Sequence, residues 1–177
     1  GRIGYAVFPT AKDANVFKTL NINYFSCVPP YNQEAAKEAL ENPLSKVAVK
    51  EMVETFEARR NLIWRQINEI PGITCQKPGG AFYLFPNISG VCENLGIIEK
   101  HQRLSKEQQS SPDNIFQMFA LYEHQVAVLD RKSFGQIGAD GKYFLRLSIA
   151  ADQAVLEEGV RRLKAASEDL SGLDKFL

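Results

Sequence analysis

The longest regular pattern in the chain is an apolar repeat at steps of three and four residues, which runs from residue 49 to residue 70 and indicates a helix over residues 46–69. Its members are Val49, Met52, Val53, Phe56, Ile63, Ile67 and Ile70. Charged residues of both signs lie mostly between them, and Pro71-Gly72 follows. The pattern predicts one long amphipathic helix that ends at the proline–glycine pair. Such a helix could join two domains or cover a single core, and the pattern alone leaves both open.

Short apolar segments after this helix predict a small sheet. The segments are residues 73–76, 81–85, 126–129 and 143–149. The second of them is almost entirely apolar, which is typical of a strand buried on both faces. We also expect a strand over residues 1–9 and a helix over residues 32–40. The predicted fold class is therefore α/β, as a mixed α+β domain with a small sheet packed by helices.

Two later segments carry more specific expectations. Residues 91–113 are rich in polar side chains and offer little to bury, so we expect a loop or surface insertion there. Asp152 is predicted to cap a final helix, and the tail after Leu170 is expected to fray. The expected buried stripe of that helix is Val155, Leu156, Val160 and Leu163.

The composition excludes several classes of function. Lysine plus arginine and aspartate plus glutamate both number 21, so nothing favours nucleic-acid binding. No segment approaches the roughly 18 apolar residues of a membrane-spanning helix. Cys27, Cys75 and Cys92 are widely spaced, which indicates free thiols in a reducing compartment and predicts a cytoplasmic protein. His101 and His124 do not have the spacing of metal ligands, so no metal site is expected.

Arg146 is the strongest single candidate for chemistry. It lies at the centre of the apolar segment 143–149, where a buried charge is costly unless it is paired. The planar guanidinium suits a carboxylate, which it can bind through two parallel hydrogen bonds. Strand alternation allows a second interpretation, in which Leu145 and Leu147 point inward and Arg146 faces solvent. The residues alone leave both interpretations open.

Six phrases of the sequence, taken in order, form a familiar set. They are GRIGY at 1–5, PP with QEAA at 29–36, RRNL at 59–62, KPGGAFYLFP at 77–86, FLRLSIA at 144–150 and EEGVRRL at 157–163. Together they resemble the fold-type I, class I/II pyridoxal-phosphate-dependent aminotransferases, most nearly the aspartate and aromatic subgroup. The resemblance implies that residues 1–44 end a large cofactor-binding domain. Residues 45–70 would then be an interdomain helix, and residues 71–177 a C-terminal small domain.

The resemblance also implies roles for individual residues. Arg2 matches the arginine that grips the phosphate of pyridoxal 5'-phosphate, and Arg146 matches the arginine that clamps the substrate α-carboxylate. Tyr31 and Asn32 match positions that contribute to a neighbouring subunit's site. The family's Schiff-base lysine falls before Gly1. We therefore expect no catalytic residue in this chain, no cofactor bound to it alone and no activity from it alone.

The activity implied for the intact enzyme is reversible amino-group transfer between an amino acid and a 2-oxo acid, by a homodimer. One departure concerns Asp130 and Arg131, a charged pair where the family has a Val-Pro-Gly-Ser run, which could alter substrate choice. Two alternatives stay open. The chain could be a separate non-catalytic module that completes or regulates a partner subunit, or part of a related lyase or decarboxylase with the same cofactor.

Overall fold

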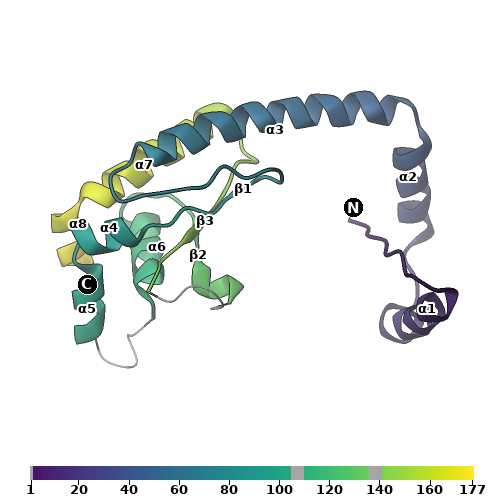
Figure 1. Cartoon of the computed structure of the whole chain (residues 1–177), viewed down its shortest axis with the longest axis horizontal. Helices are drawn as coiled ribbons and strands as arrows, with labels where there is room; N and C mark the ends of the chain where they lie inside the picture. The colour runs from purple at the N-terminus through teal and green to yellow at the C-terminus, as the bar shows by residue number, and fades with distance from the viewer. Residues whose placement is uncertain (1, 105–109, 136–140) are drawn as a thin grey trace. The chain divides into compact units, whose positions relative to one another are not determined.

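The computed structural model describes residues 2–104, 110–135 and 141–177 (Figure 1). The chain divides into two compact units, Gly1–Val53 and Glu54–Leu177. The division falls inside the long helix α3, Leu44–Asn68, so this one helix belongs to both units. No helix within the described ranges is long and apolar enough to cross a bilayer.

The first unit is helical. Helix α1 spans Ala11–Phe25 and is capped by Thr10, whose Oγ1 accepts a hydrogen bond from the Asp13 backbone N–H at 3.2 Å. Helix α2 spans Pro30–Glu41 and confirms the helix expected there. The strand expected over residues 1–9 is wrong, because residues 2–8 have no regular structure. A strand needs a partner for its backbone groups, and none of the described segments pairs with this one.

Helix α3 confirms the predicted long helix, but its apolar stripe is buried only toward the end. Ile63 and Ile67 are in the core, whereas Val49 and Met52 are more than half exposed. The end of the helix is tied to the chain that follows. The side-chain oxygen of Asn68 accepts a hydrogen bond from the Cys75 backbone N–H at 2.8 Å, and the Trp64 indole donates to the Cys75 carbonyl at 2.8 Å.

The sheet has three antiparallel strands in the order β1–β3–β2, so β3 is central. Their bounds are β1 Tyr83–Leu84, β2 Leu129–Asp130 and β3 Leu145–Ser148. The predicted strand over 73–76 contributes only an isolated bridge between Thr74 and Asn87. The expectation that segment 81–85 is buried on both faces is wrong. Leu84 is fully buried, whereas Phe82 and Phe85 are each 40% exposed.

The polar segment contains more structure than we expected. Helices α4 (Ser89–Asn94) and α5 (Ile97–Arg103) precede α6 (Pro112–Tyr122). Between residues 91 and 104, the apolar residues that are at most 2% exposed are Val91, Cys92, Leu95 and Ile97. The expectation of a loop with little to bury is therefore wrong for residues 91–104. Residues 105–109 lie outside the described part.

The chain ends in two helices, α7 (Gln153–Glu168) and α8 (Leu170–Phe176). Leu163 of α7 is buried as expected, but Val155 is 62% exposed, so the predicted stripe is wrong at that residue. Asp152 precedes α7 without capping it through its side chain, which instead pairs with Arg59 at 3.4 Å. The expectation of a frayed tail is also wrong, because α8 buries Leu173 completely.

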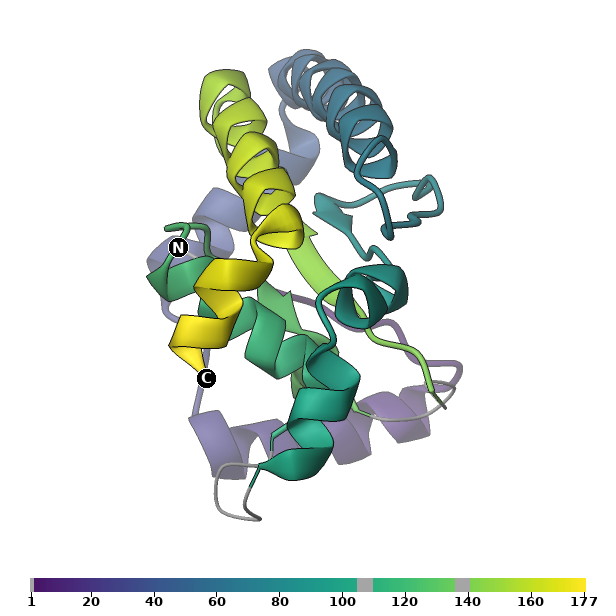
Figure 2. The same ribbon diagram turned by 90° about the vertical axis from the view of Figure 1, so that its left-hand side faces the viewer.

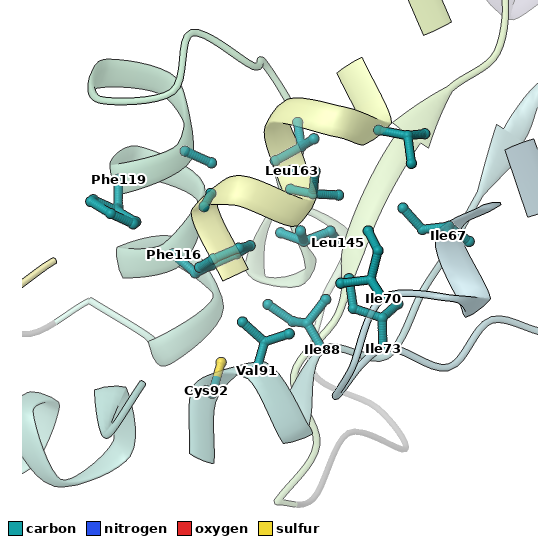
Figure 3. Packing of buried hydrophobic residues seen from close by; sticks show 14 of the residues in the cluster. Ile67, Ile70, Ile73, Ile88, Val91, Cys92, Phe116, Phe119, Leu145 and Leu163 are labelled. Carbon is teal, nitrogen blue, oxygen red and sulfur yellow. The ribbon is translucent and has the colours of Figure 1, made fainter. Parts of the chain in front are cut away.

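The core of the second unit lies between one face of the sheet and the surrounding helices. Figure 3 shows Ile67, Ile88, Phe116, Leu145 and Leu163 meeting there from α3, the β1–α4 turn, α6, β3 and α7. The end of α3 and helix α7 run side by side in Figures 1 and 2 and line one shallow groove together. The core therefore covers one face of β3, and the opposite face is left for other contacts.

Candidate functional site

The two faces of β3 differ sharply in character. Leu145 and Ile149 are fully buried on the core side. Arg146 lies on the opposite side, because successive side chains of a strand alternate. Tyr83 pairs with Ser148, so it lies diagonally across from Arg146 on the same face. The structure thus agrees with the inward orientation of the leucine next to Arg146 and places the guanidinium outside the core.

The guanidinium of Arg146 lies between two aromatic rings. Its Cζ is 4.3 Å from the ring centre of Tyr83 and 4.4 Å from that of Phe134. Both distances are well within the range of a cation–π contact. No described carboxylate forms an ion pair with Arg146. The N–H donors of a guanidinium lie in its plane, so rings that stack on its faces leave those donors available.

Further rings extend this contact into a layer. Phe85 meets Phe134 edge-on at 6.2 Å and stacks on Phe144 at 5.5 Å between ring centres. The Cζ of Arg131 lies 5.4 Å from the Phe144 ring centre. We call this layer of Tyr83, Phe85, Arg131, Phe134, Phe144 and Arg146 the arginine face. It combines positive charge with apolar surface, which suits an organic anion.

Asp130 is buried beneath the arginine face and stabilises it through hydrogen bonds. It is only 4% exposed. One carboxylate oxygen accepts a hydrogen bond from the Asn114 side chain at 2.7 Å. The other accepts from the Ser133 backbone at 3.2 Å and from its hydroxyl at 2.8 Å. These bonds hold the short 3₁₀ helix η1, Arg131–Phe134, which presents Phe134 to Arg146. Sequence reasoning missed this role, although an aspartate three residues before a serine is typical of a cap.

A groove of about 740 Å³ adjoins the arginine face. Three of its lining rings, Tyr83, Phe85 and Phe144, belong to that face. Lys77 and Lys142 add positive charge, and Lys77 also lies 5.7 Å from the Trp64 ring centre. The groove therefore extends the cationic and aromatic character of the face beyond Arg146.

The other residues singled out from the sequence lie in the first unit. Arg2 and Tyr31 are exposed, and Asn32 is half-buried in α2. No ion pair involving Arg2 occurs among the described residues. One exposed arginine by itself does not enclose a phosphate. Within the described ranges, no cluster of three His, Cys, Asp or Glu side chains could hold a metal ion.

The small antiparallel sheet, the long preceding helix and the covering helices match part of several solved aminotransferase structures. The crystal structure of the aspartate aminotransferase from Rhizobium meliloti matches this chain with a TM-score of 0.67 at 30% sequence identity. The aromatic aminotransferase from Pyrococcus horikoshii OT3 matches with a TM-score of 0.67 at 29% identity. Each match covers 87% of this chain and 35% of the other.

The curated relatives agree with the structures. The chain is 40% identical over 169 residues to the "Probable aspartate/prephenate aminotransferase" of Aquifex aeolicus (strain VF5). It is 33% identical over 170 residues to an aspartate aminotransferase of Rhizobium meliloti. It matches no protein-family model. In sequence and in fold the chain is similar to aspartate and aromatic aminotransferases of fold type I, and it spans 38% of the length of these two relatives, corresponding to their C-terminal part.

Proposed function

We propose that Arg146 binds the α-carboxylate of an amino acid or a 2-oxo acid, as part of an enzyme that transfers amino groups reversibly between the two. The observation that carries this proposal is the placement of its guanidinium between Tyr83 and Phe134, with no carboxylate of the described chain paired to it. The names of the relatives, which are aspartate and aromatic aminotransferases, support the reaction class.

In this proposal Arg146 orients the substrate. Two parallel N–H···O bonds to a carboxylate fix the plane of that carboxylate and thereby the position of the α-carbon bonded to it. Holding the reacting carbon in place contributes to the rate by removing translational and rotational freedom before the chemical step. Pyridoxal 5'-phosphate, when bound, would supply the electron sink of the reaction. Arg2 would contribute one contact to its phosphate.

We also propose the domain assignment that the resemblance implies, with residues 1–44 in a large domain, 45–70 as the connecting helix and 71–177 as the small domain. The exposed apolar surface of the first unit supports it. None of its described residues is buried, and Val7 and Phe25 are 85% and 75% exposed. Surface of this kind is normally covered by another part of the protein or by a partner.

The remaining proposals concern the setting of the intact enzyme. We propose a homodimer, in which Tyr31 and Asn32 lie near the neighbouring subunit's site. The three cysteines are free thiols, which suits a reducing compartment, so we propose a cytoplasmic location. We further propose that the 177-residue chain alone does not transaminate, because the family's Schiff-base lysine matches no position in it. Neither Lys46 in α3 nor Lys106, which lies outside the described residues, fits the family's motif.

Carboxylate binding can be tested on the chain itself by NMR with ¹⁵N-labelled arginine. Titration with 2-oxoglutarate should shift the Arg146 Nε signal saturably, and Arg146→Gln should remove the response. Arg161→Gln is the matched control, since Arg161 is a surface arginine on α7 that pairs with Glu158. Shifts that persist unchanged in Arg146→Gln would refute the proposed site.

The same protein can be assayed for turnover of aspartate with 2-oxoglutarate in the presence of pyridoxal 5'-phosphate. We expect no turnover and no specific lysine adduct after borohydride reduction. Turnover together with a single labelled lysine would refute the proposal that the chain alone is inactive. It would also place a cofactor lysine within these 177 residues.

A further inference from the structure

We propose that Tyr83 and Phe134 are positioning residues that fix the plane of the Arg146 guanidinium before a ligand binds. The inference rests on the proposed function, because the orientation matters for a carboxylate bound at Arg146. Tyr83 and Phe134 do not hydrogen-bond the carboxylate themselves, but they set the orientation of the Arg146 guanidinium that does. We call the pair the ring clamp.

The two rings come from opposite sides of the central strand. Tyr83 belongs to β1 and Phe134 ends η1, which follows directly after β2. Because the strand order is β1–β3–β2, Arg146 on β3 is flanked by both neighbours. Its Cζ is nearly equidistant from the two ring centres, at 4.3 and 4.4 Å. A guanidinium held between two rings cannot rotate about its Nε–Cζ bond without meeting one of them.

Each ring of the clamp is itself held in place. Tyr83 packs against Phe82 with 4.4 Å between ring centres, and Phe82 lies 6.2 Å from Phe56 of α3. Phe134 meets Phe85 edge-on, and its turn is capped by the buried Asp130. The ring clamp is therefore held by contacts with the sheet and with α3, and its shape does not depend on a ligand.

This arrangement has a consequence for affinity. A long arginine side chain has many rotamers, and a ligand that must order the side chain loses affinity for that reason. The ring clamp orders the side chain during folding instead. Its contribution depends on an aromatic ring at each position and not on the Tyr83 hydroxyl. Tyr83→Phe and Phe134→Tyr should therefore preserve the affinity of Arg146 for a carboxylate, whereas Tyr83→Leu and Phe134→Leu should lower it.

The clamp is tested first without any ligand. In the ¹⁵N-arginine spectrum of the whole chain, hindered rotation should separate the Nη signals of Arg146. Tyr83→Leu and Phe134→Leu should merge them through faster rotation, whereas Tyr83→Phe and Phe134→Tyr should leave them separate. Tyr122→Leu is the matched control, because Tyr122 is 64% exposed on α6 and contacts Phe176 instead of Arg146. Backbone amide spectra identify any variant that has lost its fold.

A titration with acetate, and with acetamide as the uncharged comparison, then links the clamp to binding. We expect the leucine variants to bind acetate at Arg146 about tenfold more weakly than the conservative variants, the loss of affinity that ordering one long side chain on binding can cause. Separate Nη signals in folded Tyr83→Leu and Phe134→Leu would overturn the clamp alone. A wild-type chain whose Arg146 signals ignore acetate would overturn the proposed function while leaving the clamp as a structural fact.

Discussion

The backbones of Gly72 and Gly90 lie so close together that neither residue has room for a Cβ atom. A Cβ on Gly90 would stand 2.7 Å from the Gly72 Cα, and one on Gly72 would stand 2.6 Å from the Gly90 carbonyl carbon. Gly72 also has a φ of +84°, a backbone angle that residues other than glycine rarely adopt. The contact joins the turn after α3 to the first turn of α4, so it holds these two turns together within the second unit.

Gly90→Ala should destabilise the second unit by about 1–3 kcal/mol, because the added methyl group meets backbone that cannot move aside easily. Alanine is otherwise the better helix former by about 1 kcal/mol, so the expected sign is opposite to that of helix propensity. Urea unfolding followed by far-UV circular dichroism measures the difference. Gly80→Ala is the control, since no heavy atom lies within 4 Å of its added Cβ. Equal stability of the two variants would contradict the close approach.

Leu173→Ala should cost about 2–5 kcal/mol of unfolding free energy, the usual range for removing a fully buried leucine. Leu173 is 0% exposed on α8, whereas Leu177 at the chain end is 43% exposed. Leu177→Ala should therefore change stability by about 0.5 kcal/mol or less. Thermal unfolding of the two variants compares them directly. A Leu173→Ala protein as stable as Leu177→Ala would mean that the tail frays after all.

Glu158 should titrate far below an ordinary glutamate. Hydrogen bonds from Arg161 at 2.6 Å and from Arg162 at 2.7 Å lower its pKa from 4.5 to about 2. A lowered folded-state pKa means that the associated stability is present above pH 4.5 and is lost as the pH falls toward 2. The ¹³C shift of the carboxyl group measures the midpoint. In Arg161→Gln the midpoint should move back toward 4.5, and an unchanged midpoint would contradict the role of that arginine.

The three thiols should differ in reactivity toward iodoacetamide. Cys27 is exposed, whereas Cys75 and Cys92 are buried. Burial raises the pKa of both buried thiols, and Asp113 and Glu93 raise that of Cys92 further. Since the thiolate is the reactive form, we expect fast labelling at Cys27 alone under native conditions and at all three in urea. Mass spectrometry of digested protein identifies the sites, with Cys27→Ser as the control. Native labelling of Cys92 at the rate of Cys27 would contradict its burial.

Periodicity predicted the elements whose pattern is long and uninterrupted. Helix α3 and the buried Leu163 of α7 followed from spacing alone, because the apolar face of an amphipathic helix packs against the core. The pattern failed where burial depends on which neighbour is present. The same stripe that buries Ile67 leaves Met52 exposed, and no local signal separates the two residues. Residues 2–8 alternate like a strand yet pair with no described segment.

Polar content misled the prediction for residues 91–104. The polar side chains there are exposed or half-buried on and beside two short helices, while Val91, Leu95 and Ile97 are buried. Average composition cannot detect a division of this kind over so few turns.

The sequence singled out Arg146, but its surroundings come from distant parts of the chain. Tyr83 and Phe134 are brought to it only by the strand order, and Asp130 supports the turn of Phe134 through bonds to α6 and η1. Such relationships depend on tertiary pairing, which the separate phrases of the sequence do not contain. The resemblance to a family selected Arg146 as the candidate for carboxylate binding, whereas the rings beside it required the structure.

The alternation of β3 also limits how this part of the protein can change over time. Loss or gain of one residue within Leu145–Ser148 would turn the arginine toward Ile67 and Phe116 and expose a leucine where the arginine stood. Loss or gain of two residues would restore the alternation of the two faces. We therefore expect related chains to vary in length at the turns on either side of this strand. Wherever the arginine is retained, residues within the strand should be gained or lost only in even numbers.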